Sequence, residues 1–301
     1  MKKFVKYAFF SAVLLISGII ILLMYVSANH NDIVNYISEK NANKSSFILI
    51  GNAPFAQFKV GNRTGTALVD TGSTISGIDV SKLESRYYSS AGSINVTSVF
   101  NTSDQNLYLL SSLKVLGREI TDVLVTSSGS DGLNIIGSPE IFSRDKLFLT
   151  KHNIYYDDKA AIEVLNRNKI PVVVIRDRDN TGKTSAVYLK LNINGIDELV
   201  LLDTGLSTLL TATNADLKSG NKSFLPSVRL LRTYNDTTIK TSYSYDAVIK
   251  IGTNEIISDY DVIENFIKPR ARFYLGPKIF DYYAIYFDFG KKEFYFVDIN
   301  S

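Results

Sequence analysis

Two stretches of the chain share one pattern, an apolar run that ends in Asp-Thr-Gly. The first reads Ala67-Leu68-Val69-Asp70-Thr71-Gly72-Ser73-Thr74, and the second reads Val200-Leu201-Leu202-Asp203-Thr204-Gly205-Leu206-Ser207. An apolar, β-prone run that stops at Asp and then meets Gly is typical of a buried strand ending in a tight turn, with a carboxylate held at the turn. Two such turns facing each other would form a carboxylate pair.

The sequence around the two motifs also repeats. Upstream, Phe58–Asn62 aligns without a gap with Leu191–Gly195, and both predict the end of one strand and a turn into the next. Downstream, Asn134–Phe142 resembles Phe273–Phe280, at a similar distance from each aspartate. Duplication of a small β domain explains both similarities.

Composition excludes several kinds of catalysis. The chain has 301 residues, of which 45% are hydrophobic, enough to build cores for one large or two small domains. It has no cysteine, which excludes thiol catalysis and cysteine-ligated metal, and its two histidines, His30 and His152, argue against a Ser-His-Asp triad or a histidine-rich zinc site. We therefore expect no metal and no cofactor, and chemistry based on carboxylates, hydroxyls or lysines.

The charge of the chain is balanced. Three of the 33 basic residues, Lys2, Lys3 and Lys6, lie at the N-terminus, and without them the basic residues match the 30 acidic ones. This balance predicts no binding to nucleic acid.

The N-terminal region predicts a membrane anchor. Residues 8–26 carry no charge, and as a helix at about 1.5 Å per residue they would span roughly 28 Å, close to the core of a bilayer. With lysines before it, the positive-inside rule predicts residues 1–7 as a cytoplasmic tail, 8–26 as a transmembrane helix or signal anchor, and 27–45 as a tether outside the cytoplasm. Cleavage of a signal peptide near Val26-Ser27-Ala28 is the alternative. The absence of disulfides favours a bacterial envelope protein, with its main domain in the periplasm or at the cell surface.

The paired motifs resemble those of the aspartic proteases, both the pepsin-like and the retropepsin-like kinds. In that family each apolar-apolar-Asp-Thr-Gly turn is accompanied by a later apolar-apolar-Gly strand, which here is Ile135-Ile136-Gly137 or Tyr274-Leu275-Gly276. The resemblance implies an all-β, two-lobed acid-protease fold from an internal duplication, with lobes at 46–168 and 169–301. It also implies that Asp70 and Asp203 are the catalytic pair and that the substrate is a protein or peptide.

The resemblance further implies roles for the residues beside the pair. The hydroxyls of Thr71 and Thr204 would each form a hydrogen bond to the opposite turn. Gly72 and Gly205 would let backbone N–H groups approach the carboxylates. The Ser73 hydroxyl would form a hydrogen bond to an outer carboxylate oxygen.

Leu206 departs from the pattern, because it stands where Ser73 stands in the first copy. Without a hydroxyl at this position, the ionised pair lacks one hydrogen bond, so its pKa values should be higher than with two hydroxyls. We therefore expect activity that extends towards mildly acidic or near-neutral pH. Retropepsins can lack this hydroxyl in both copies and remain active, so Leu206 does not imply an inactive protein.

Each half of the chain also predicts a hairpin between its two motifs. Residues 93–110 surround a polar turn at 101–104, and residues 228–245 surround one at 235–236. By resemblance these hairpins would cover the substrate cleft, with Phe100 and Tyr234 facing substrate; ordinary strand positions are the alternative for both. Val172–Ile175 predicts a buried strand, either the counterpart of Phe47–Ile50 or part of a sheet beneath both lobes.

These observations predict a membrane-anchored aspartic endopeptidase that acts on exported or envelope proteins. One chain supplies both aspartates, so we expect a monomer. The alternative is a catalytically inactive peptide-binding or structural envelope protein of the same fold.

Overall fold

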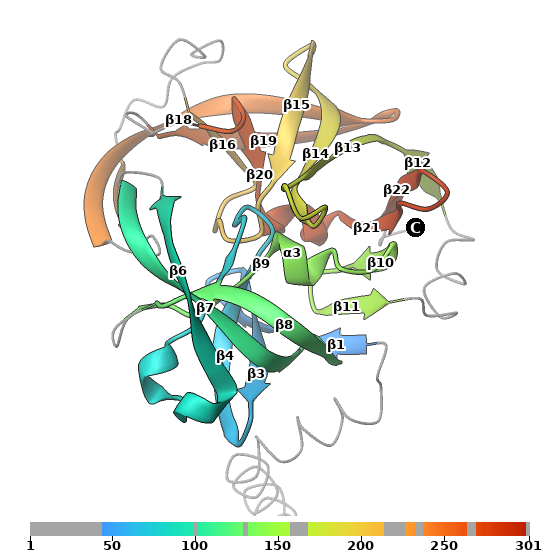
Figure 1. The fold of residues 1–301 in the computed structure, drawn as a ribbon. Coiled ribbons are helices and arrows are strands. Elements are labelled where there is room, and N and C mark those ends of the chain that lie inside the picture. The colour runs from blue at the N-terminus through green and yellow to red at the C-terminus, as the bar shows by residue number, and fades with distance from the viewer. Residues whose placement is uncertain are drawn as a thin grey trace, which may run out of the picture. The chain divides into compact units, whose positions relative to one another are not determined.

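The described part of the chain is built mostly from β-strands, which are arranged in three sheets (Figure 1). The computed structural model describes residues 44–98, 102–128, 132–156, 168–213, 227–232, 237–263 and 269–298. The predicted tail, the predicted membrane helix at 8–26 and the tether up to residue 43 lie outside these ranges. Among the described residues, no helix has the length and apolar character needed to cross a membrane.

The first sheet holds the first Asp-Thr-Gly turn. Its order is β2-β3-β4-β9-β5-β8-β7-β6. The strands are β2 (Ile48–Ile50), β3 (Ala53–Val60), β4 (Arg63–Asp70), β5 (Ser76–Gly77), β6 (Tyr88–Thr97), β7 (Thr102–Val115), β8 (Arg118–Thr126) and β9 (Ile135–Gly137). Three short helices accompany them: η1 (Val80–Lys82), η2 (Ser85–Tyr87) and α3 (Ser138–Ile141).

The second sheet holds the second turn. Its order is β13-β14-β15-β20-β16-β19-β18-β17. The strands are β13 (Val173–Arg178), β14 (Thr184–Ile193), β15 (Ile196–Leu202), β16 (Leu210–Ala212), β17 (Ser227–Arg232), β18 (Thr237–Ile251), β19 (Asn254–Val262) and β20 (Phe273–Leu275). The short helix η4 (Pro277–Asp281) follows β20, as α3 follows β9.

The two sheets have the same topology, position for position. In each, a hairpin leads to the Asp-Thr-Gly turn, β3–β4 in the first and β14–β15 in the second. The strand before each turn then runs parallel to a later strand, β9 or β20, and the first strand of the hairpin also pairs with a long strand, β7 or β18. The same path through two sheets is what duplication of one β domain produces.

The third sheet joins the two halves of the chain. Its order is β1-β11-β10-β21-β22-β12, so the first half pairs with the second where β10 meets β21. Its strands are β1 (Lys44–Ser46), β10 (Lys146–Leu149), β11 (Asn153–Tyr156), β12 (Lys169–Pro171), β21 (Tyr283–Asp288) and β22 (Glu293–Asp298). Phe142 and Phe287 meet edge to face with ring centroids 5.5 Å apart, which packs the first half against this sheet.

Two hairpin turns follow directly from the sequence. Gly61 and Gly195 have positive φ angles of 57° and 83°, and Asn194 has φ of 52°. Gly enters this region without steric cost and Asn does so more readily than most residues, so Gly-Asn and Asn-Gly provide the tight reversals that the sequence predicts.

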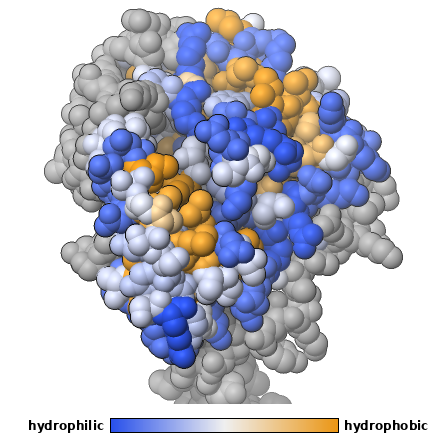
Figure 2. Space-filling view, viewed as in Figure 1, coloured by the Kyte–Doolittle hydropathy of each residue, from blue (hydrophilic) through white to orange (hydrophobic). Residues whose placement is uncertain are grey.

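The predicted burial of Val172–Ile175 is wrong. β13 is the edge strand of the second sheet, and the side chains of Val173 and Ile175 are 59% and 45% exposed. Leu199 of the neighbouring strand β15 is also exposed, at 46%. Figure 2 shows a hydrophobic area on the surface over β13–β15. A run of β-branched residues predicts a strand, but it does not distinguish an edge strand from a central one.

The predicted turn at 101–104 is also misplaced. Thr102 already belongs to β7 and pairs with Thr97 of β6, so the reversal lies between these residues. Phe100 and Tyr234, the two predicted substrate-facing aromatics, lie outside the described residues, as does the predicted turn at 235–236.

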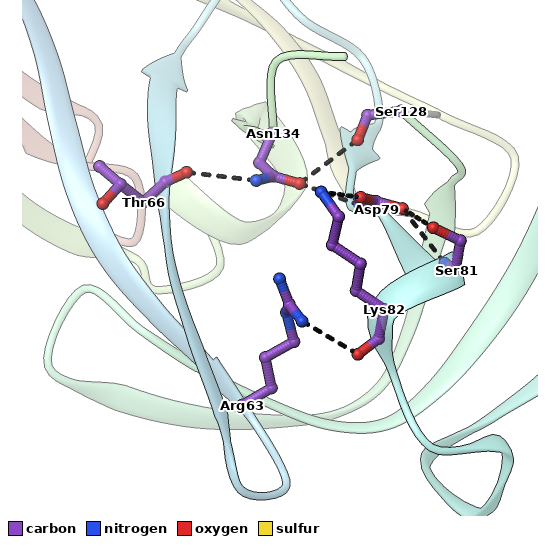
Figure 3. A network of polar contacts seen from close by, with 7 residues as sticks. All are labelled: Arg63, Thr66, Asp79, Ser81, Lys82, Ser128 and Asn134. Carbon is purple, nitrogen blue, oxygen red and sulfur yellow. Dashed lines mark hydrogen bonds and ion pairs between the residues drawn. The ribbon is translucent and has the colours of Figure 1, made fainter. Parts of the chain in front are cut away.

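A polar network fixes the approach to the first turn (Figure 3). The side-chain oxygen of Asn134 accepts hydrogen bonds from the Asp79 N–H at 2.9 Å and the Ser128 hydroxyl at 3.3 Å, and its amide donates to the Thr66 carbonyl at 3.3 Å. Asp79 also pairs with Lys82 at 2.8 Å. Asn134 therefore ties the segment before β9 to β4, beside which β9 must lie.

Replacing Asn134 by Ala should destabilise the protein by about 1–3 kcal/mol, because the Asp79 N–H would lose its acceptor in a partly buried site. Asn95→Ala, at an exposed position of β6, should change stability by less than about 0.5 kcal/mol. Urea unfolding of the two variants beside the wild type provides the measurement. Equal effects would show that the network does not support the fold.

Candidate active site

The two Asp-Thr-Gly turns are placed by matching pairs of parallel strands. β4 pairs with β9 so that Asp70 lies opposite Gly137, and β15 pairs with β20 so that Leu202 lies opposite Leu275. The apolar residues before each aspartate are buried in the core, as the apolar runs predict. Each carboxylate is therefore held where a buried strand ends.

Thr71 and Thr204 connect the two turns by four hydrogen bonds. The Thr71 hydroxyl donates to the Leu202 carbonyl at 2.8 Å and accepts from the Thr204 N–H at 3.0 Å. Reciprocally, the Thr204 hydroxyl donates to the Val69 carbonyl at 2.5 Å and accepts from the Thr71 N–H at 3.1 Å. Both threonines are fully buried, so each hydroxyl satisfies a donor and an acceptor of the opposite turn away from water.

The glycines of the two turns lie against the opposite carboxylates. A Cβ atom added to Gly72 would lie 2.5 Å from Cγ of Asp203, and one added to Gly205 would lie 2.6 Å from Cγ of Asp70. Any side chain at either position would displace a carboxylate. The two aspartates, 133 positions apart in the sequence, thus meet across the junction of the turns.

Backbone N–H groups hold the two carboxylates unequally. Asp70 Oδ1 accepts hydrogen bonds from the N–H groups of Gly72 at 2.8 Å and Ser73 at 3.1 Å, whereas Asp203 Oδ1 accepts one from Gly205 at 3.0 Å. Ser73 and Leu206 occupy corresponding places, and the N–H of each also approaches the main-chain carbonyl of its own aspartate, at 3.2 Å for Ser73 and 3.4 Å for Leu206. The Asp70 carboxylate is therefore the better stabilised of the two as an anion.

The expected role of the Ser73 hydroxyl is not found. Its single proton is donated to the Ile75 carbonyl at 2.7 Å, and the contact of Ser73 with Asp70 comes from its backbone N–H. The sequence identifies Ser73 as a neighbour of the carboxylate but does not determine the rotamer of its side chain.

Burial and mutual charge shift the protonation of the pair. Burial raises the pKa of Asp203 well above its ordinary value, and the negative charge of Asp70 raises it further. Burial also raises the pKa of Asp70, while the hydrogen bonds from Gly72, Asp203 and Ser73 oppose the rise. Because two such carboxyls resist ionising together, the pair holds one proton over a range of pH, and the geometry favours Asp203 as its carrier.

Two further residues, Arg270 and Tyr274, lie near the pair. The Arg270 guanidinium donates to the Gly72 carbonyl at 3.2 Å, and its positive charge lowers the pKa of both aspartates. The Tyr274 hydroxyl, which accepts the Arg270 N–H at 2.9 Å, has a pKa raised by burial. Tyr274 belongs to the predicted apolar-apolar-Gly strand, but only the tertiary structure brings Arg270 to the pair.

The described residues offer no cluster of three or more His, Cys, Asp or Glu side chains that could hold a metal ion. The chemistry available here is that of one carboxylate beside one carboxylic acid, which can take a proton from one atom and give a proton to another.

Thr204→Ala should destabilise the protein by about 2 kcal/mol or more, because the Val69 carbonyl and the Thr71 N–H would be left buried without partners. Thr204→Ser keeps the hydroxyl and should cost only about 1 kcal/mol for the lost methyl group. Urea unfolding of the pair of variants separates the two effects. Equal losses would show that the hydrogen bonds between the turns contribute little.

The raised pKa of Asp203 predicts how stability depends on pH. The stability that protonated Asp203 contributes is fully present below the pKa of Asp in the unfolded chain, about 4. This stability is lost as pH rises through the higher pKa that Asp203 has in the folded state. Asp203→Asn should therefore raise the melting temperature at pH 7 by about 2 °C or more, with no gain below a pH of about 4.

Asp79→Asn provides a control of opposite sign. Although burial opposes ionisation of Asp79, hydrogen bonds from Lys82 and Ser81 outweigh it and lower the pKa. The stability that Asp79 contributes is present above the unfolded pKa and lost as pH falls, so Asp79→Asn should lower the melting temperature at pH 7. A loss of stability at pH 7 in both variants would contradict the assignment for Asp203.

Comparison with known proteins establishes the fold. No protein-family model and no curated protein matches the sequence. Among solved structures, the chain is similar to the crystal structure of the aspartic proteinase from Irpex lacteus, with a TM-score of 0.54 and 12% sequence identity, over 85% of this chain and 97% of that one. At this identity the likeness is one of fold, and it confirms the predicted, mostly β, aspartic-protease fold. The chain thus has the fold of an aspartic proteinase, with its two Asp-Thr-Gly turns joined at the centre.

Proposed function

We propose that the protein is an aspartic endopeptidase that hydrolyses peptide bonds with a water activated between Asp70 and Asp203. The observation that carries the proposal is the reciprocal joining of the two turns, which brings each carboxylate against the opposite glycine. The similarity of fold to an aspartic proteinase supports the same activity. A purely structural role would leave unexplained why two carboxyls are buried against each other at a cost in stability.

In the first step, water adds to the peptide carbonyl. The ionised Asp70 takes a proton from the water as its oxygen forms a bond to the carbonyl carbon, while the protonated Asp203 gives its proton to the carbonyl oxygen. The product is a neutral tetrahedral diol. The assignment of the base to Asp70 follows from its two backbone N–H donors, against one for Asp203.

In the second step, the diol breaks down. Asp70, now protonated, gives its proton to the amide nitrogen, and Asp203, now ionised, takes a proton from a hydroxyl of the diol as the C–N bond breaks. An acid and an amine leave, and the pair returns to its first protonation state. Burial raises the pKa values of the pair, so we expect the one-proton state, and activity, to extend to mildly acidic or near-neutral pH.

For the substrate we propose an extended segment of a protein or peptide, bound between the hairpins β6–β7 and β17–β18 by pairing along strand edges. Phe100 and Tyr234, in the connections of these hairpins, remain the proposed substrate-facing aromatics. We also propose that the uncharged segment 8–26 anchors the chain in a membrane, with the two lobes outside the cytoplasm. One chain supplies both aspartates, so a monomer suffices.

Asp70→Asn and Asp203→Asn should each reduce cleavage of a diverse peptide library by about a thousandfold or more, because either change removes a proton carrier. Asp122→Asn, at an exposed position whose φ of 54° Asn tolerates, is the matched control and should keep full activity. The library should be digested by the full chain in mild detergent, across pH, with and without a statine-type inhibitor. If the folded wild type cleaves nothing at any pH, the inactive peptide-binding or structural protein becomes the better interpretation.

A further inference from the structure

We infer that Arg270 is a positioning residue of this site, which fixes the first turn to the second sheet and holds a positive charge beside the carboxylate pair. The inference deepens the proposed function and rests on it for its kinetic consequences. Its structural consequences can be measured without any cleavage.

The guanidinium of Arg270 spans the two lobes. Nη1 donates to the carbonyl of Gly72 in the first turn at 3.2 Å, and Nη2 donates to the carbonyl of Ser185 in β14 at 3.1 Å. Gly72 is the residue whose Cα lies against the Asp203 carboxylate. A shift of the Gly72 backbone would therefore change the separation of the two carboxyls, and Arg270 opposes such a shift with a planar group that makes both bonds at once.

Arg270 is itself held by the strand next to the second turn. Its backbone N–H donates to the hydroxyl of Tyr274 at 2.9 Å. Tyr274 is buried with Ala186 and Leu201 in a small apolar cluster, and it lies opposite Leu201 in the pairing of β20 with β15. The position of Arg270 is thus coupled to β15, the strand that ends directly before Asp203.

The second lobe does not brace its own turn as the first lobe does. In the first lobe, Ser138 follows Gly137 and donates from its hydroxyl to the Thr71 carbonyl at 2.6 Å and from its N–H to the Ser73 carbonyl at 2.9 Å. After Gly276 the corresponding residue is Pro277, which has neither donor. The first turn is therefore held from both lobes, by Ser138 and by Arg270, and serves as the fixed half of the site.

The charge of Arg270 acts against the burial of the pair. Burial raises the pKa values of both aspartates, and the positive charge of the nearby guanidinium lowers them. Among the described residues, other ionisable groups near the pair are Tyr274 beside Asp203, and Glu140 behind the first turn. Glu140 contacts the Ser76 hydroxyl that accepts the Gly137 N–H, and the positive charges of Lys183 and Arg118 act on it.

Two substitutions separate the charge from the bridge. Arg270→Lys keeps a positive charge but cannot span both carbonyls with a planar group, whereas Arg270→Gln loses the charge as well. Arg144→Gln, at an exposed position between α3 and β10, is the matched control for the loss of one positive charge. All three are compared with the wild type as full chains in mild detergent.

The first measurement is the melting temperature from acidic to neutral pH. Loss of the charge raises the pKa values of the folded pair further, so the stability that is lost as pH rises becomes larger. The melting temperature of Arg270→Gln should therefore fall further below that of the wild type as pH rises. The difference for Arg270→Lys should stay constant with pH, and the difference for Arg144→Gln should stay near zero. A deficit of Arg270→Gln that is independent of pH would overturn the inference, whether or not the protein cleaves peptides.

The second measurement is the pH profile of kcat/KM on a peptide that the wild type cleaves. Arg270→Gln should move the profile to higher pH beyond any change in Arg144→Gln, and both Arg270 variants should lose about tenfold in maximal rate because the first turn is less well positioned. An unmoved profile with a reduced rate would show a structural role alone and overturn the inference. If no peptide is cleaved, the proposed function fails, and the melting data alone decide on Arg270.

Discussion

The site depends on the four hydrogen bonds that Thr71 and Thr204 exchange between the turns. Each hydroxyl completes the hydrogen bonding of the opposite turn, so neither turn is satisfied without the other, and both threonines are buried. The shared sheet places the lobes so that this exchange is possible, because β10 of the first half pairs with β21 of the second. Fold and site are thus stabilised by the same contacts.

The same geometry creates an electrostatic cost. The absence of side chains at Gly72 and Gly205 lets the carboxyls approach, and their burial beside each other raises the pKa of Asp203 most. Unequal N–H donation then stabilises the anion of Asp70 more than that of Asp203 in a nearly symmetric fold. Arg270 adds a further asymmetry, since it acts on the first turn from the second lobe. Duplication provides two equal turns, and these local differences give them different properties.

The features predicted from the sequence are those coded by local patterns. The hairpin turns at Gly61 and Gly195, the strands before Asp70 and Asp203 and the apolar-apolar-Gly strands all form as expected. The exposure of Val173 and Ile175 was not predictable, because edge or central position depends on the whole sheet. The Ser73 hydroxyl donates to the Ile75 carbonyl, an orientation of the side chain that the local sequence does not determine. Arg270 contacts Gly72 across a sequence separation of 198 positions, and no local motif predicts such a contact.

The measurement that tests the account most directly is the titration of the two aspartates themselves. In a chain labelled with carbon-13 at its Asp carboxyl carbons, the Asp→Asn variants would identify the signals of Asp70 and Asp203, and NMR would follow both with pH. If the pair is coupled, the two signals respond together in two well-separated steps, and the upper step lies above the ordinary range of Asp pKa values. Independent titration of both groups near the ordinary Asp pKa would show that the turns do not bring the carboxyls together, and the proposed catalytic pair would have to be abandoned.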